Sequence, residues 1–242
     1  MTSWVRSLAM AGLVWPAGVG NASAHISDPV EYAQSLTGES PRIFFEQAPA
    51  LLITIDGDPV YRRVDGTNLE RIVNTRAFIV RDHGGIHYLK AFDGWMEAYA
   101  LNGDWSVSGV APEGGIEAFR RAVNAKLVDR LDDDNLPTDT PRLATKVPRI
   151  VVSSEPAALI VTEGPAHYQK IEGTSLEYLV NTTAKVFREP TDQELYVLVG
   201  ARWFRAWATD GPWEFIRDDD LPADIAERIT KTRKHEEEDL QP

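Results

Sequence analysis

The sequence predicts an all-β protein in which two tandem, homologous, small antiparallel β modules, barrel- or sandwich-like, are joined by one amphipathic helix. Three observations predict this fold. Pro41-Arg42-Ile43 recurs as Pro148-Arg149-Ile150. Each copy consists of short alternating apolar segments that are separated by turn residues. A stretch with helical periodicity lies between the two copies. The length of 242 residues fits one or two domains.

The duplication extends through both copies. At an offset of 107 residues, which separates Pro41 from Pro148, identical residues recur at Pro49, Ala50, Leu52, Ile53, Gly57, Tyr61, Gly66, Thr67, Leu69, Glu70, Val73, Asn74 and Thr75. After one extra residue in the second copy the offset is 108, and identities continue at Tyr88, Trp95, Ala98, Gly103 and Trp105. The inserted residue falls in an expected hairpin turn, residues 82–85 against 190–193. Turns tolerate such insertions.

The strands are predicted from alternation and from β-branched or aromatic residues. In the first copy they are residues 51–55, 60–64, 69–75, 77–81, 86–92, 95–100 and 105–107. In the second copy they are residues 158–162, 168–171, 176–182, 184–188, 195–199, 202–208 and 213–216. We expect the matched glycines Gly57, Gly164, Gly66 and Gly173 to occupy turns that need permissive backbone angles.

The helix is predicted over residues 113–131, because Ile116, Phe119, Val123, Leu127 and Leu131 are spaced by three and four residues. We expect it to pack on a β module, or alternatively to bind a partner. The predicted organisation is therefore a signal peptide (1–24), an N-terminal segment (25–40), the first module (41–110), the helix (113–131), a polar linker (132–147), the second module (148–225) and a charged tail (226–242).

The first 24 residues have the layout of a secretory signal peptide. Arg6 provides the positive charge, an apolar stretch runs over residues 8–19, and Ala22-Ser23-Ala24 places small residues where a signal peptidase cleaves. A bilayer-spanning helix needs about 20 apolar residues, so this stretch is too short for an anchor. We therefore expect an exported protein, periplasmic or extracellular, with no integral membrane segment in the mature chain.

Composition and motifs disfavour several functions. The 25 Lys and Arg residues against 37 Asp and Glu residues give a formal charge of −12, which argues against nucleic-acid binding. The chain has no cysteine, so disulfides, thiolate metal sites and cysteine nucleophiles are excluded. We find no nucleophile elbow, phosphate-binding loop, dinucleotide fingerprint or zinc-protease motif. His83 and His87 flank a turn, and the second copy lacks both. We therefore predict no catalytic residue, cofactor or metal.

Aromatic residues provide the candidate ligand site. Trp95, Glu97 and Tyr99 share one face of a strand, and Trp203, Arg205 and Trp207 are their counterparts. Indole rings can stack on sugars while polar neighbours bind hydroxyl groups. Alternatively, the four tryptophans that match between copies fill the cores of the modules: Trp95, Trp203, Trp105 and Trp213. Tyr99 and Trp207 differ in type at one position, which favours a surface role. Because Glu97 is replaced by Arg205, the two copies would not bind identical ligands.

The second copy also carries a recurring pattern. It comprises Tyr-Val-Leu-Val-Gly-Ala-Arg-Trp-Phe-Arg-Ala-Trp-Ala-Thr-Asp-Gly-Pro-Trp over residues 196–213, with Gly173-Thr174, Leu176, Tyr178 and Asn181-Thr182 upstream and Leu221-Pro222-Ala223-Asp224 downstream. This pattern resembles a repeat of large exported Gram-negative proteins, often labelled carbohydrate-binding family five/twelve. The resemblance covers residues 41–110 and 148–225, although Gly103-Asp104-Trp105 lacks the proline. It implies an envelope location and a non-catalytic role.

These observations lead to one expected function and two alternatives. We expect an exported, non-enzymatic envelope protein that binds a polysaccharide or cell-wall glycan through Tyr99, Trp207 and their neighbours. The first alternative is a protein-interaction or assembly factor that binds an envelope protein through its β edges and the helix between the modules. The second is a glycan hydrolase that uses a pair of carboxylates, whose separation cannot be inferred from the sequence.

Overall fold

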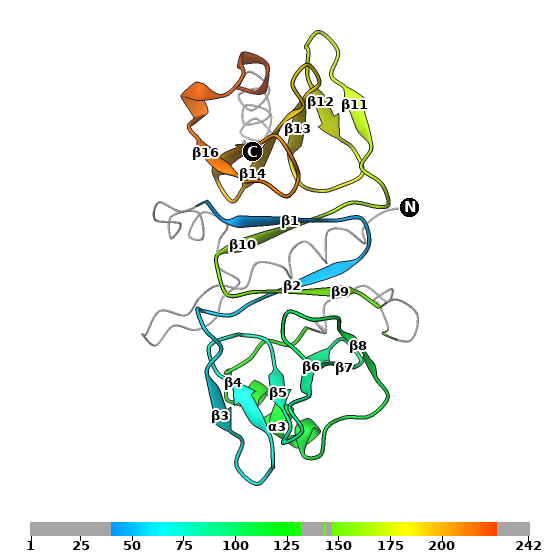
Figure 1. Ribbon diagram of the computed structural model, residues 1–242, viewed down its shortest axis with the longest axis vertical. Coiled ribbons are helices and arrows are strands. Elements are labelled where there is room, and N and C mark those ends of the chain that lie inside the picture. Colours follow the sequence, from blue (N-terminus) through cyan, green and yellow to red (C-terminus); the bar gives the residue numbers. More distant parts are fainter. Residues whose placement is uncertain (1–39, 132–142, 144–146, 227–242) are drawn as a thin grey trace, which may run out of the picture.

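The computed structural model describes residues 40–131, 143 and 147–226. The fold is mostly β, with two six-stranded antiparallel sheets in two halves that are separated in sequence by one helix (Figure 1). This confirms the predicted fold class. The expected signal peptide, the N-terminal segment up to residue 39, most of the linker and the tail from residue 227 lie outside the described residues.

Each sheet is a meander in which consecutive strands are neighbours. The first sheet contains β3 (Tyr61–Arg63), β4 (Glu70–Ile72), β5 (Ile79–Arg81), β6 (His87–Ala91), β7 (Gly94–Ala98) and β8 (Ser106–Ser108). The second contains β11 (Tyr168–Lys170), β12 (Glu177–Leu179), β13 (Val186–Glu189), β14 (Glu194–Val199), β15 (Arg202–Ala206) and β16 (Glu214–Ile216). The strands correspond one to one, and the offset changes in the turn before β14, as the sequence predicts.

Turn interactions also recur in both halves. The Asn74 side chain donates to the carbonyls of Asp56 and Asp58 and accepts from the Val60 backbone N–H. Asn181 makes the three equivalent bonds in the second half. Gly57, Gly66, Gly164 and Gly173 all have positive φ, as expected for the turns they occupy. Each asparagine therefore stabilises a turn that lies 14 to 18 residues before it in the sequence.

Four further strands exchange between the halves. They are β1 (Arg42–Glu46), β2 (Ala50–Thr54), β9 (Arg149–Ser153) and β10 (Ala157–Val161). Strand β1 pairs in parallel with β10, and β2 pairs in parallel with β9. Figure 1 shows these two pairs lying between the two sheets. The sequence pattern does not predict β1 and β9 as strands, because their residues do not alternate.

The cores of the two halves are completed by these exchanged strands. Ile43 and Phe45 of β1 pack with the second-half core, and the Phe45 ring stacks on Trp213 at 5.8 Å with an interplanar angle of 10°. Ile150 and Val152 of β9 occupy the equivalent places in the first-half core. Each copy therefore contributes apolar side chains to the core of the other copy.

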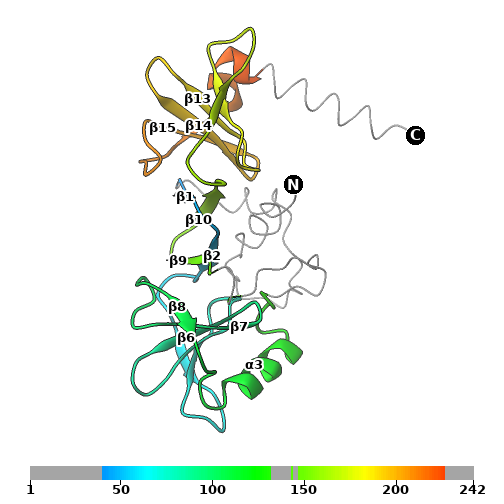
Figure 2. The same ribbon diagram turned by 90° about the vertical axis from the view of Figure 1, so that its right-hand side faces the viewer.

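The helix between the copies is shorter than predicted. Helix α3 spans Gly115–Asn124, and it lies against the first sheet (Figure 2). Lys126 has a φ of 55°, its N–H bonds to the Val123 carbonyl, and the Leu127 N–H bonds to the Ala122 carbonyl. This is the Schellman arrangement that ends a helix. The apolar spacing continues past the helix because Leu127 belongs to this terminal turn.

Both faces of each sheet are covered. In the first half, Ala118 and Ala122 of α3 pack with Trp95 and Phe78 on one face, while the exchanged strands cover the other. In the second half, the single turn η1 (Asp218–Asp220) is followed by Leu221 and Ile225, which pack on the equivalent face. Of the helices among the described residues, none has the length and apolar character to span a bilayer.

Candidate functional site

The two matched tryptophans at the predicted ligand face are core residues. Trp95 is 7% exposed and packs edge-on against Phe78, and Trp203 is 2% exposed and packs against Phe187. The expectation that these two indoles contact a ligand is therefore wrong. Alternation correctly places Trp95 on one face of β7 and Trp203 on the equivalent face of β15. Helix α3 covers the first of these faces, and the segment after β16 covers the second. The alternative, that they fill the core, describes them correctly.

Tyr99 and Trp207 are exposed. Tyr99 is 89% exposed and Trp207 is 59% exposed. Each is the first residue after its strand, since β7 ends at Ala98 and β15 ends at Ala206. The buried pattern of the strand stops at that alanine, so the next side chain extends into solvent. Of the predicted stacking residues, these two are accessible to a ligand.

Arg205 is held next to Trp207 by two carboxylates. Its Nη1 lies 3.6 Å from Glu194 Oε1, and its Nη2 lies 3.4 Å from Glu214 Oε2. The Arg205 Cζ atom is 6.0 Å from the centroid of the Trp207 ring, at the outer limit of a cation–π contact. Glu214 lies directly opposite Arg205 on β16, and Tyr196 lies opposite it on β14. Glu194 precedes Tyr196 by two residues on β14, so its side chain lies on the same sheet face as Arg205. The result is a preorganised polar surface beside an exposed indole.

The carboxylate of Glu194 is also bound by a neighbouring tyrosine. The hydroxyl of Tyr196 donates a hydrogen bond to Glu194 Oε2, and both residues are buried. Burial, together with the hydrogen bond to Glu194, raises the pKa of the Tyr196 phenol above its ordinary value. The phenol therefore stays protonated at neutral pH and remains a donor. Glu194 can then direct its other oxygen toward Arg205.

The first half lacks this network. Glu97 occupies the position of Arg205, and its Oε2 lies 2.6 Å from the Ser108 hydroxyl. The position equivalent to Glu194 is Ile86, so the buried carboxylate is missing there. The polar residues beside Tyr99 and Trp207 therefore make different contacts in the two halves. The second half carries the more elaborate candidate site, which consists of Trp207, Arg205, Glu214 and Glu194.

A second polar cluster is identical in both halves, and the sequence interpretation missed it. The Arg81 guanidinium lies 3.8 Å from the centroid of the Tyr61 ring and binds Glu70 at 2.7 Å. Arg188, Tyr168 and Glu177 repeat the arrangement, also with 3.8 Å between guanidinium and ring. All three residue types are kept at the 107-residue offset, which is the signal that could have revealed the cluster. It links β3, β4 and β5 and has a structural role.

His87 extends the first-half cluster. Its Nε2 lies 2.8 Å from the Tyr61 hydroxyl, and the residue is buried. Burial and the nearby Arg81 guanidinium hold the pKa of His87 below its ordinary value. Leu195 occupies the equivalent position in the second half. The described residues contain no group of three or more side chains suited to a metal ion.

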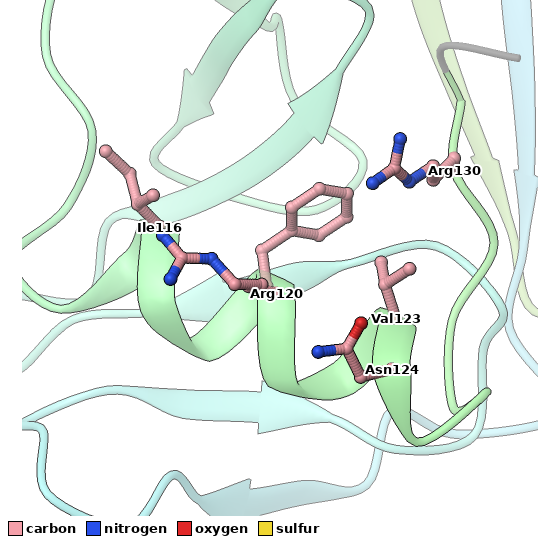
Figure 3. Close-up of a pocket in the computed structure, with 6 residues that line it drawn as sticks. Ile116, Arg120, Val123, Asn124 and Arg130 are labelled. Atoms are coloured by element: carbon pink, nitrogen blue, oxygen red, sulfur yellow. The ribbon is translucent and has the colours of Figure 1, made fainter. Parts of the chain in front are cut away.

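A shallow pocket lies over α3. It encloses about 160 Å³ and is lined by Ile116, Phe119, Arg120, Val123, Asn124 and Arg130. Figure 3 shows Arg130 facing the helix from the segment that follows it. Ile116 is 58% exposed, which leaves apolar surface accessible on the helix. This side of α3 is therefore a second candidate surface.

Support for either surface comes from its geometry. Comparisons of the chain with protein-family models, with curated proteins and with solved structures find no match.

Proposed function

We propose that this is a non-catalytic exported envelope protein that binds a polysaccharide or cell-wall glycan at the end of β15. Trp207 provides the stacking surface, and Arg205 and Glu214 bind hydroxyl groups. One observation carries the proposal: a 59% exposed indole lies beside an arginine that forms ion pairs with two carboxylates. The resemblance to repeats labelled carbohydrate-binding agrees with this function.

The chemistry of the surface suits a sugar. The apolar C–H face of a pyranose ring can stack on an indole, and the ring hydroxyls need both donors and acceptors nearby. Arg205 supplies donors, and Glu214, whose side chain is 55% exposed, supplies acceptors. The ion pairs of Arg205 with Glu194 and Glu214 restrict its side chain, which lowers the entropy cost of ligand binding.

The same geometry favours binding over hydrolysis. A glycosidase needs one carboxyl group that can give up a proton and a second that acts as nucleophile or base. Here the Arg205 guanidinium contacts both Glu194 and Glu214. The guanidinium therefore lies between these two carboxylates, where a glycosidase places the scissile bond.

Tyr99 provides a separate, simpler contact. It is more exposed than Trp207, but Glu97 replaces the arginine at the position two residues before it. A phenol ring offers less stacking area than an indole, and Glu97 offers acceptors only. We therefore assign the principal contact to the second half and an auxiliary contact to Tyr99.

Retention on immobilised glycans tests the proposal. The chain is passed over chitin, peptidoglycan and other insoluble polysaccharides, beside Trp207→Ala, Tyr99→Ala and the matched control Phe215→Ala. Phe215 is also exposed, at 53%, but it packs edge-on against Phe204 on the opposite sheet face from Arg205. We expect Trp207→Ala to weaken retention about five- to thirtyfold, since one stacking contact contributes roughly 1–2 kcal/mol. Equal loss with Phe215→Ala, or no retention by any chain, would reject the assignment.

A second candidate function is a protein-interaction or assembly factor of the envelope. The exposed Ile116 and the pocket that it shares with Arg120 on α3 favour it. Such a role predicts that Ile116→Glu abolishes co-purification of an envelope protein while glycan retention stays unchanged. Trp207→Ala should have the reverse effect.

A further inference from the structure

We propose that the exchanged strands form an interface between repeats that does not depend on their covalent linkage, so that one half of this protein also binds the complementary half of a second copy. The partner is therefore another copy of the same chain. The surface consists of β1 and β2 in the first half and of β9 and β10 in the second.

The register of the pairs is that of a twofold interface. Arg42 lies opposite Ala157, and Ala50 lies opposite Arg149. Adding 107 to the first-copy member of one pair and subtracting 107 from its partner gives the other pair. The two parallel ladders are thus the same contact made twice with the copies reversed. This reciprocity defines an isologous interface, which in most proteins joins two identical chains.

Hydrogen bonds beyond the ladders repeat the symmetry. The Arg42 N–H bonds to the Pro156 carbonyl at 2.9 Å, and the Arg149 N–H bonds to the Pro49 carbonyl at 2.9 Å. At the other end, the N–H of Thr162 bonds to the Glu46 carbonyl at 2.8 Å. Its counterpart joins Ile55 to Ser153, also at 2.8 Å. Each of these bonds crosses from one copy to the other.

The exchanged side chains explain why neither half is complete alone. Without β1, the second half would lose Ile43 and the Phe45 ring that covers Trp213. Without β9, the first half would lose Ile150 and Val152. Each half would then expose apolar core surface, which drives association with any chain that carries the missing strand. The ion pair of Arg149 with Glu46, at 3.0 Å, adds a polar contact across the same boundary.

Cleavage between the halves tests the proposal. A protease site is inserted between residues 132 and 142 of the full chain, and the purified protein is cut under native conditions. We expect the two fragments to elute together at the mass of the uncut chain and to separate only in denaturant. Fragments that separate under native conditions as folded monomers would overturn the proposal.

Mixing isotopically light and heavy preparations tests binding between copies. The two cut preparations are denatured, combined, refolded and analysed by native mass spectrometry. We expect mixed light–heavy complexes at about the abundance of the unmixed ones. If each preparation refolds but no mixed complex forms, the interface does not act between copies. If cut preparations do not refold, prolonged incubation of the native cut complexes provides the same readout.

Discussion

Removal of the Phe45 ring should destabilise the half to which this residue does not belong in sequence. Phe45 lies in the first copy, but its ring stacks on Trp213 and packs with the second-half core. Phe45→Ala removes on the order of 100 Å² of buried apolar surface, or about 2.5 kcal/mol. The lost ring–ring contact adds roughly 0.5–1.5 kcal/mol. We therefore expect a loss of about 3 kcal/mol, or roughly a 100-fold change in the unfolding equilibrium.

Hydrogen exchange followed by mass spectrometry locates the effect. In Phe45→Ala we expect the largest loss of amide protection in the second sheet, at β13, β14 and β15. The matched control is Val152→Ala, at the equivalent place in β9, whose side chain packs with the first-half core. Its effect should be smaller, about 1 kcal/mol for a partly buried valine, and should be largest in β5, β6 and β7.

If the strands are exchanged, each substitution must reduce amide protection mainly in the sheet of the other copy. Loss of protection confined to the first sheet in Phe45→Ala would show that β1 packs on its own copy. That result would refute the exchanged arrangement of the cores and remove the basis for binding between copies. Urea unfolding of both variants gives the corresponding free energies of unfolding.

Three other substitutions test particular contacts. The pKa of His87 is lowered in the folded state, so stability should fall as pH drops below about 6.5 toward that lower pKa; His87→Leu, which copies Leu195, should flatten this part of a urea-midpoint profile. Arg188→Met should lower the free energy of unfolding, measured in urea, by about 1 kcal/mol. It removes a close contact with the Tyr168 ring and a partly solvated ion pair with Glu177. Asn181→Ala removes three hydrogen bonds to the turn before β11. It should lower the free energy of unfolding, determined by thermal unfolding, by about 1–3 kcal/mol.

Much of the local structure could be predicted because the duplication tests each pattern twice. The matched glycines at residues 57 and 164 predict turns, and both have positive φ. The one-residue shift in offset predicts an insertion in the turn after β13, where the structure has it. Both predictions concern the local backbone of a turn, so they do not depend on distant contacts.

The partners of the exchanged strands could not be predicted, for a physical reason. The segments 42–46 and 149–153 are copies, as are 50–54 and 157–161, so pairing within a copy and pairing between copies join nearly the same residues. The hydrophobic pattern then fits both arrangements, although the three-residue connection from β1 to β2 permits only antiparallel pairing within a copy. The choice depends on the short connection from β1 to β2 and on the fit of Ile43 and Phe45 into the facing core. Neither is visible in a linear pattern.

The candidate site was predicted in part for a related reason. Alternation places Trp203, Arg205 and Trp207 on one strand face. It does not reveal that Leu221 and Ile225 cover Trp203, nor that β15 ends before Trp207. Burial on a sheet face depends on which later segment packs against it. The carboxylates that hold Arg205 come from the neighbouring strands β14 and β16, so their contact with Arg205 depends on strand register.

The two halves differ at exposed strand ends as well as in the exchanged strands. A change in β1 or β9 alters the core of the opposite copy. Tyr99 and Trp207, the first residues after β7 and β15, are exposed and belong to neither core. The pairs Glu97 and Arg205, and Tyr99 and Trp207, differ at these places, while the Tyr–Arg–Glu clusters within the sheets are identical. A new ligand-binding surface can therefore arise at these exposed strand ends without loss of the fold.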